Sequence, residues 1–120
     1  MSKAQLKSKG GPVEVTPRQV LEEALPRALK AQEKQAKNIG ATYVINLGGD
    51  DGGEWTVDLK NVEVRRGAAK NPDVVLEMMD KDFSAMTRGK LDVGQATREG
   101  RIRISGSPDM VASLGHLISG

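Results

Sequence analysis

The sequence predicts an α+β domain with one largely antiparallel sheet that is covered on one side by helices. Three observations predict this class. Apolar residues recur at helical spacing near the N-terminus, alternate with a period of two in the middle of the chain, and return to helical spacing after residue 80. With 120 residues, of which 38% are hydrophobic and 28% charged, the chain is expected to form one domain with a packed core.

The first helix has a clear start signal in Thr16-Pro17-Arg18-Gln19, which combines a capping threonine, a proline suited to the first turn and a glutamine three residues after the cap. Because Pro26 cannot donate a backbone hydrogen bond, we expect a kink or break near Leu25. A second helix should then run to about Asn38, and Gly40 should end it. The apolar residues of this region are Val20, Leu21, Ala24, Leu25, Ala28 and Leu29.

Alternating residues predict strands at 41–47 and 54–60. The cluster Gly48-Gly49-Asp50-Asp51-Gly52-Gly53 lies between them, and it lacks the Lys-Ser/Thr of a phosphate-binding loop. We therefore interpret it as the turn of an antiparallel hairpin with one solvent-facing side. Further strands are expected at 62–66 and 74–79.

The second half of the chain predicts two short helices, a strand and a final helix. Asp80 is expected to cap the first short helix, and Asp92 the second, which ends at Gly100. A strand follows at 101–105. The last helix, 108–118, should pack its apolar side over the sheet, formed by Met110, Val111, Leu114, Leu117 and Ile118.

Composition excludes several classes of function. The chain has no cysteine and one histidine, so thiolate sites and paired-histidine metal sites are impossible. His116 has no acidic or nucleophilic neighbour in the sequence, and we expect no catalytic residues, no metal and no cofactor. A net charge of +2 and only three side chains of the Phe, Trp and Tyr types argue against nucleic-acid binding.

The N-terminal residues 1–15 contain no apolar run typical of a secretory signal, and no segment has the roughly 20 apolar residues of a membrane span. We expect a flexible tail at 1–15, a single domain at 16–120 and a cytoplasmic location. Lys30, Lys34 and Lys37 share one helix face. A solvated face explains them, but an anionic membrane surface would also be attracted there transiently.

Methionines mark the candidate binding region. Met78, Met79 and Met86 lie where the predicted sheet gives way to short helices. Ordinary core packing is one interpretation. The other is an apolar cavity, because short helices without large aromatic side chains leave space above a sheet, and methionine adapts to varied ligands.

Several segments together resemble the sterol carrier protein type-2 (SCP2) family over residues 16–117. They are Trp55-Thr56-Val57-Asp58-Leu59-Lys60, Pro72-Asp73-Val74-Val75-Leu76, Asp80-Lys81-Asp82-Phe83, Gly89-Lys90-Leu91-Asp92 with Ala96, and Gly100-Arg101-Ile102-Arg103-Ile104-Ser105-Gly106. The resemblance implies a five-stranded sheet covered by helices, with an apolar tunnel that accepts sterols, fatty acids, acyl-CoAs or similar lipids, and no catalysis when the domain stands alone. The patterns Thr16-Pro17-Arg18 and Ala24-Leu25-Pro26 are more similar to prokaryotic members. The chain departs from animal members at Thr97-Arg98-Glu99, and it ends without a peroxisomal tripeptide.

We expect the cavity to be lined by residues on the inward faces of elements too short to close over one another: Met79, Phe83, Met86, Leu91, Ala96, Ile102, Ile104 and Leu114. A lipid headgroup would lie at the mouth, held by Arg98 or Lys90. The alternative function is an accessory module of the same fold that supports a lipid or quinone pathway by contacting a protein partner or a second copy of the chain. An internal cavity favours the carrier, whereas a filled core with a large exposed apolar patch favours the module.

Overall fold

A computed structural model describes residues 16–119, and the predicted tail at 1–15 lies outside this part of the chain. Five strands form one sheet in the order β3-β2-β1-β4-β5. The bounds are β1 Thr42–Gly48, β2 Gly53–Asp58, β3 Glu63–Arg66, β4 Val74–Met79 and β5 Arg103–Ser105. The sheet is mostly antiparallel, as predicted, but β1 and β4 at its centre pair in parallel.

Two carboxylates hold the ends of the parallel pair. At the start, Asp73 donates its backbone N–H to the Thr42 carbonyl and accepts the Thr42 N–H on Oδ2, both at 2.8 Å. At the other end, Asp80 Oδ2 accepts the backbone N–H of Asp51, in the turn between β1 and β2, at 2.9 Å. Asp80 was expected to cap the helix that follows, but it lies inside the first turn of that helix and fixes the hairpin instead.

The N-terminal helical region comprises α1 (Pro17–Gln19), the π-helical η1 (Val20–Ala24), α2 (Leu25–Ala31) and α3 (Glu33–Ile39). The predicted capping box between Thr16 and Gln19 is present. Near Leu25, where a kink or break is expected, the chain changes from a π-helix to an α-helix without leaving helical conformation. The Leu25 N–H bonds to the Val20 carbonyl five residues back, and Pro26 lies in the first turn of α2, where a missing N–H costs little. The actual break is at Gln32, whereas Gly40 ends α3 with φ 60°, as predicted.

The predicted hairpin of β1 and β2 is confirmed, but the side that we expected to face solvent is partly covered by the loop after β3. Thr56 is 1% exposed. Its hydroxyl donates to the Gly67 carbonyl at 2.7 Å and accepts the Ala69 N–H at 2.9 Å. The loop after β3 therefore lies over this side of the sheet. Asp58, also buried, accepts the backbone N–H groups of Lys60 and Asn61 and so closes the turn into β3.

The C-terminal half contains α4 (Asp80–Thr87), α5 (Val93–Arg98) and α6 (Pro108–Ser119). Asp92 caps α5 as predicted, accepting the Gln95 N–H at 3.0 Å. Helix α6 buries Leu114 and Leu117, and the Tyr43 hydroxyl on β1 donates to its Met110 carbonyl at 2.7 Å. The Ile118 side chain lies outside the described part.

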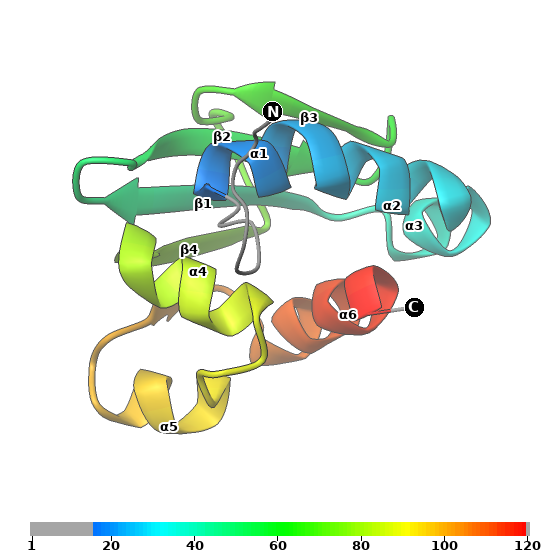
Figure 1. Ribbon diagram of the computed structural model, residues 1–120. Helices are drawn as coiled ribbons and strands as arrows, with labels where there is room; N and C mark the ends of the chain where they lie inside the picture. The colour runs from blue at the N-terminus through cyan, green and yellow to red at the C-terminus, as the bar shows by residue number, and fades with distance from the viewer. Residues whose placement is uncertain (1–15, 120) are drawn as a thin grey trace, which may run out of the picture.

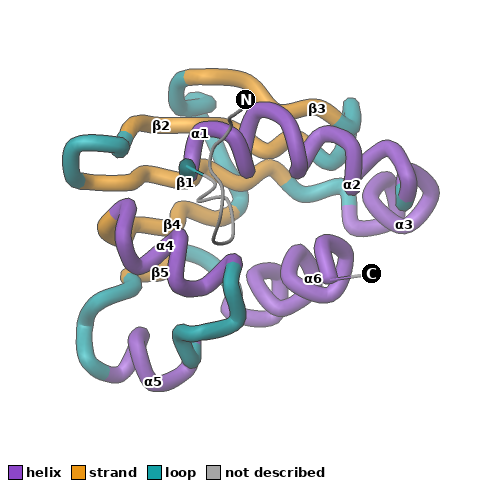
Figure 2. Tube along the Cα trace, viewed as in Figure 1, coloured by secondary structure: helices purple, strands orange, loops and turns teal. Residues whose placement is uncertain are grey.

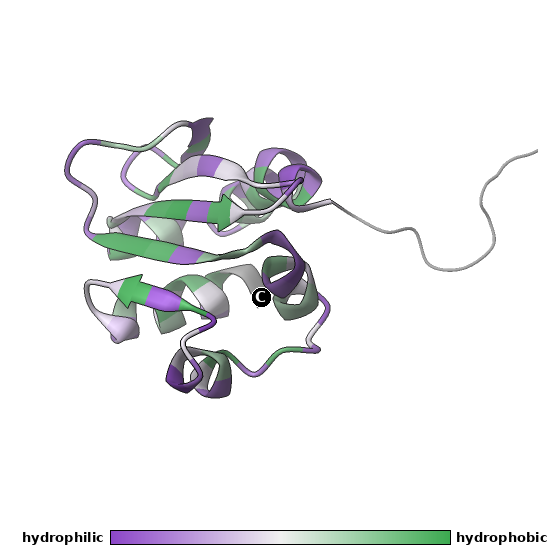
Figure 3. Cartoon of the chain, turned by 90° about the vertical axis from the view of Figure 1, so that its left-hand side faces the viewer, coloured by the Kyte–Doolittle hydropathy of each residue, from purple (hydrophilic) through white to green (hydrophobic). Residues whose placement is uncertain are grey.

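The helices lie in front of the sheet in Figure 1, with α1, η1 and α2 crossing the β1–β3 half and α4 beside β4. Figure 2 shows the same arrangement as a trace, with α6 below α2 and α3. Hydrophobic residues are concentrated along the strands in Figure 3. The buried side chains from both layers form one cluster between sheet and helices.

We predict that Gly49→Ala destabilises the domain, because Gly49 has φ 101° and an added Cβ would overlap the Asp80 carboxylate. Strain and overlap together should lower Tm by roughly 5–10 °C. Gly67→Ala is the matched control, since Gly67 has φ 92° but open space around its Cα. Thermal unfolding followed by circular dichroism should show the larger loss for Gly49→Ala, and equal losses would contradict a role for the Asp80 contact.

Candidate functional site

An apolar cavity of about 1120 Å³ lies between the sheet and the helices. Its floor is formed by β1, β4 and the segment leading into and through β5, with Ile45, Leu76, Met78, Ile102 and Ile104. Its walls come from the N-terminal helical region, the α4–α5 segment and α6. The cavity therefore collects side chains from eight of the twelve elements of the described fold.

Small side chains explain why this space is not filled. The helices present Ala24, Ala28, Gly94, Ala112 and Gly115 to the cavity. None of these reaches far from its helix, and Phe83 supplies the one aromatic ring among the lining residues. Protein interiors are normally close-packed, so an apolar space of this size is typical of a binding site rather than of a packing defect.

The structure brings six of the eight sequence-predicted residues to the cavity, namely Phe83, Met86, Leu91, Ile102, Ile104 and Leu114. Met79 is elsewhere. Side chains alternate along β4, so Met78 faces the cavity while Met79 is 51% exposed beside Gly48. Ala96 is buried in α5 but belongs to a separate surface hollow.

The headgroup residues expected from the sequence do not line the cavity. Lys90 lies at the surface hollow, and Arg98 is exposed on α5. The charged residue of the cavity wall is Arg88, at the end of α4. The N-terminal wall is not among the cavity residues predicted from the sequence, although Ala24, Leu25 and Ala28 share one helical face.

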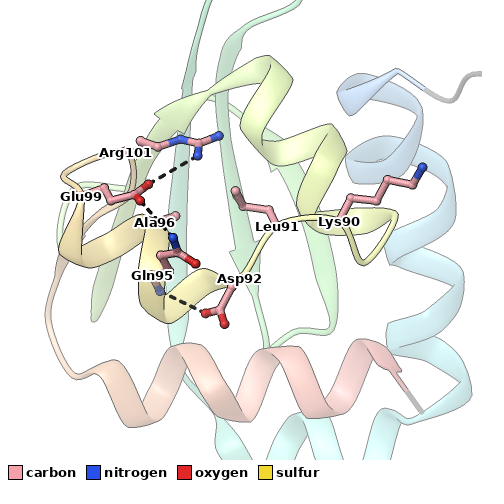
Figure 4. A pocket seen from close by; sticks show the side chains of 7 residues that line it. All are labelled: Lys90, Leu91, Asp92, Gln95, Ala96, Glu99 and Arg101. Atoms are coloured by element: carbon pink, nitrogen blue, oxygen red, sulfur yellow. Dashed lines mark hydrogen bonds and ion pairs between the residues drawn. The ribbon is translucent and has the colours of Figure 1, made fainter.

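The surface hollow around α5 is small, about 170 Å³, and polar. Figure 4 shows its side chains joined to one another: Gln95 Nε2 donates to Glu99 at 3.1 Å, and Arg101 contacts Glu99 at 3.5 Å. Arg101 also donates to Asp82 on α4 at 2.6 Å. Because these groups satisfy one another, the hollow serves to connect α5 and the segment before β5 to α4.

Among residues 16–119, no group of three or more His, Asp or Glu side chains is placed to hold a metal ion. His116 is exposed on α6. Within the same residues, no helix is both long and apolar enough to cross a bilayer. Lys30, Lys34 and Lys37 are exposed, with Lys37 paired to Glu33 at 3.3 Å, and their attraction to an anionic membrane stays a prediction.

Comparison with known protein families decides what kind of domain carries this cavity. The sequence model of the SCP-2 sterol transfer family matches residues 21–119. The chain belongs to this family. The family resemblance predicted from the sequence is thereby confirmed.

The relatives of this SCP-2 domain are longer proteins. Human hydroxysteroid dehydrogenase-like protein 2 is 32% identical over 118 residues, which cover 96% of this chain and 27% of that protein. Peroxisomal multifunctional enzyme A of Dictyostelium discoideum is 35% identical over 89 residues, covering 70% of this chain and 20% of that protein. Human sterol carrier protein 2 is 30% identical over 90 residues, which cover 71% of this chain and 16% of that protein. The chain thus spans at most about a quarter of these relatives' length.

Solved structures share the fold. Palmitated SCP2L2 from Aedes aegypti has a TM-score of 0.70 and 26% identity, covering 88% of this chain and 96% of that one. The apo form of sterol carrier protein 2 from Yarrowia lipolytica has a TM-score of 0.67 and 25% identity, and the match covers 83% of this chain and 84% of that one. The complex of Aedes aegypti sterol carrier protein 2 with palmitate, at 20% identity and a TM-score of 0.59, shows the fold alone.

In this SCP-2 domain, Glu22 anchors the cavity wall to the sheet. One oxygen, Oε2, accepts the Trp55 indole N–H at 2.9 Å and the Arg66 Nε–H at 2.7 Å. These hydrogen bonds, first from Trp55 and then from Arg66, hold the pKa of Glu22 below its usual value. Glu22 lies in η1, which lines the cavity, so a single carboxylate connects that wall to β2 and β3.

We predict that Glu22→Gln lowers Tm by a few degrees at pH 7, because the amide can still accept from the indole but loses the charge that pairs with Arg66. A lowered native pKa gives stability that is present above the unfolded value of about 4.3 and is lost as the pH falls through the native pKa. The Tm difference from wild type should therefore shrink below about pH 4. A difference that is the same at pH 3 and pH 7 would contradict this.

Glu22→Ala is the comparison variant. It removes the acceptor of the indole as well as the charge, so it should also shift the emission of Trp55, the single tryptophan of the chain. Glu22→Gln should shift it less.

Proposed function

We propose that this domain binds one apolar lipid in its cavity and carries it without catalysing a reaction on it. The observation that carries the proposal is the cavity of about 1120 Å³, whose wall is almost entirely aliphatic. Ligand pockets of about 300–1,000 Å³ are usual for small molecules, and this one is slightly larger than that range. Membership in a sterol transfer family and the palmitated relative support the same conclusion.

The apolar wall can supply enough affinity by itself. Burying an acyl chain contributes about 0.8 kcal/mol per methylene, so ten methylenes supply roughly 8 kcal/mol before ordering costs. A net free energy of that size corresponds to a micromolar dissociation constant, so a tail longer than ten methylenes is needed to offset the ordering costs. Hydrophobic burial does not depend on the orientation of the buried groups, so we expect the cavity to accept apolar tails of several kinds. The expected contacts include Phe83, Met86, Leu91, Ile102, Ile104 and Leu114.

The alternative, a protein-interaction module with a filled core, is less well supported. It would need a broad exposed apolar patch. In the described part of the chain, Met79, which is 51% exposed, is the only large hydrophobic residue that counts as exposed. The carrier function is therefore the one that the distribution of apolar surface favours.

We predict that Met86→Trp weakens the binding of a fluorescent fatty acid at least tenfold, because the indole would occupy cavity volume that the tail needs. Met79→Trp is the matched control: it makes the same substitution seven residues away on the exposed side of β4, and it should bind like wild type. Fluorescence titration gives the dissociation constants, and circular dichroism verifies that both variants are folded.

Native mass spectrometry of wild type purified without detergent should show a defined lipid mass increment that Met86→Trp reduces. If wild type takes up no lipid at micromolar concentration, or if both tryptophan variants bind equally well, the proposed site is wrong and the interaction module is favoured.

A further inference from the structure

The cavity wall carries its polar groups in one corner. In the described residues it contains a single charged side chain, Arg88, together with the hydroxyls of Ser84, Thr87 and Thr97. Ser84, Thr87 and Arg88 are spaced three and four residues apart, so they share one face of α4 and its end. Thr97 faces the cavity from α5. The remaining wall is aliphatic apart from Phe83 and a few glycines.

Arg88 is not neutralised by the structure around it. Within residues 16–119 no carboxylate forms an ion pair with it, whereas Arg66 pairs with Glu22 and Arg101 pairs with Asp82. An arginine always keeps its charge and has five N–H donors in a planar fork that fits an oxyanion with two bonds. A guanidinium without an ion-pair partner at the edge of an apolar cavity can therefore pair with an anionic group of a ligand.

Neighbouring groups neither compete for the guanidinium nor substitute for it. The last carbonyls of α4 accept hydrogen bonds from nearby donors. The Ser84 carbonyl accepts from the Arg88 N–H and the Thr87 hydroxyl, and the Ala85 carbonyl accepts from the Lys90 N–H. The Thr97 hydroxyl donates to the Val93 carbonyl at 2.7 Å. Both threonine protons are thus used, which leaves Arg88 as the strong donor of this corner and the half-buried Ser84 hydroxyl as a second one.

We propose that Arg88 binds the head of the carried lipid, and that this residue makes the domain prefer an amphiphile with a terminal oxyanion, either carboxylate or phosphate, over an uncharged amphiphile with the same tail. The inference rests on the proposed carrier function. The tail would lie along the apolar floor, and the oxyanion would meet Arg88 at the exposed end of α4, where water can still solvate it. Arg88 is then a specificity-determining residue, and the tail supplies most of the affinity.

The test compares three ligands with the same sixteen-carbon tail and different heads: palmitate, hexadecyl phosphate and hexadecanol. Their dissociation constants are measured by displacement of a fluorescent fatty acid from wild type, Arg88→Gln and Arg98→Gln. Arg98→Gln is the matched control, since it removes an exposed arginine from nearby α5 that is not part of the cavity wall. Thermal unfolding of each variant confirms that the fold is retained.

We expect Arg88→Gln to weaken palmitate or hexadecyl phosphate about tenfold and to leave hexadecanol unchanged. Wild-type binding of these anions should weaken as salt is added, and this dependence should be smaller in Arg88→Gln. Whichever anion loses more affinity identifies the head as carboxylate or phosphate. Arg98→Gln should bind all three ligands like wild type.

Other outcomes separate this inference from the function on which it rests. If wild type binds the alcohol as tightly as both anions, or if Arg88→Gln weakens all three ligands equally, Arg88 does not recognise a head and the inference is wrong, while the carrier function stands. If wild type binds none of the three ligands, the carrier function itself fails.

Discussion

The parallel pairing of β1 with β4 is the constraint on which the rest of the fold depends. It aligns the C-terminal ends of both strands, so that the β1–β2 turn and the start of α4 lie next to each other beyond those ends. The chain leaves β4 as α4 on the same side of the sheet as the N-terminal helices (Figure 1). The floor of the cavity is formed by side chains of these two central strands and of β5, and its position follows from this pairing.

A sheet and helices with a cavity between them pack against each other less completely than the layers of a filled core. In this domain, polar contacts at the periphery replace part of that packing. Tyr43 donates to the backbone of α6, Glu22 joins η1 to Trp55 and Arg66, and Arg101 joins the segment before β5 to Asp82 on α4. Each contact fixes one element of the cavity wall at its margin, which leaves the interior apolar and unobstructed. Directional hydrogen bonds suit this role because they set a position without filling volume.

The sequence predicts the elements well because hydrophobic period and capping are local properties. Thr16, Gly40 and Asp92 act where their local context indicated. What it does not predict depends on contacts distant in the chain. The parallel direction of β4 is set by partners such as Thr42 and Asp73, thirty-one residues apart, and no local pattern encodes it.

The same distinction explains the candidate site. The periodicity of Ile102 and Leu114 predicts that they face inward, and both lie on the cavity wall. Met79 does not, because side chains alternate along β4 and Met78 takes the inward position. Ala24 and Ala28 were missed because a small side chain that borders a void has the same local pattern as one that packs in a core. Arg88 follows the helix that carries Met86, and only its position on the assembled wall distinguishes it from the exposed lysines and arginines nearby.

The order of the strands also bears on how readily the sheet could pair with a second chain. The sheet ends in β3 and β5, which have four and three residues. β3 is Glu63-Val64-Arg65-Arg66, and β5 begins with Arg103. Short edge strands that carry charge are poor templates for a second chain, because they offer very few backbone hydrogen bonds and their charged side chains would lose water on pairing. A domain with a large apolar interior exposes apolar surface when it unfolds locally, and such surface favours aggregation. Short, charged edge strands make it less favourable for two locally unfolded copies to join into an extended intermolecular sheet.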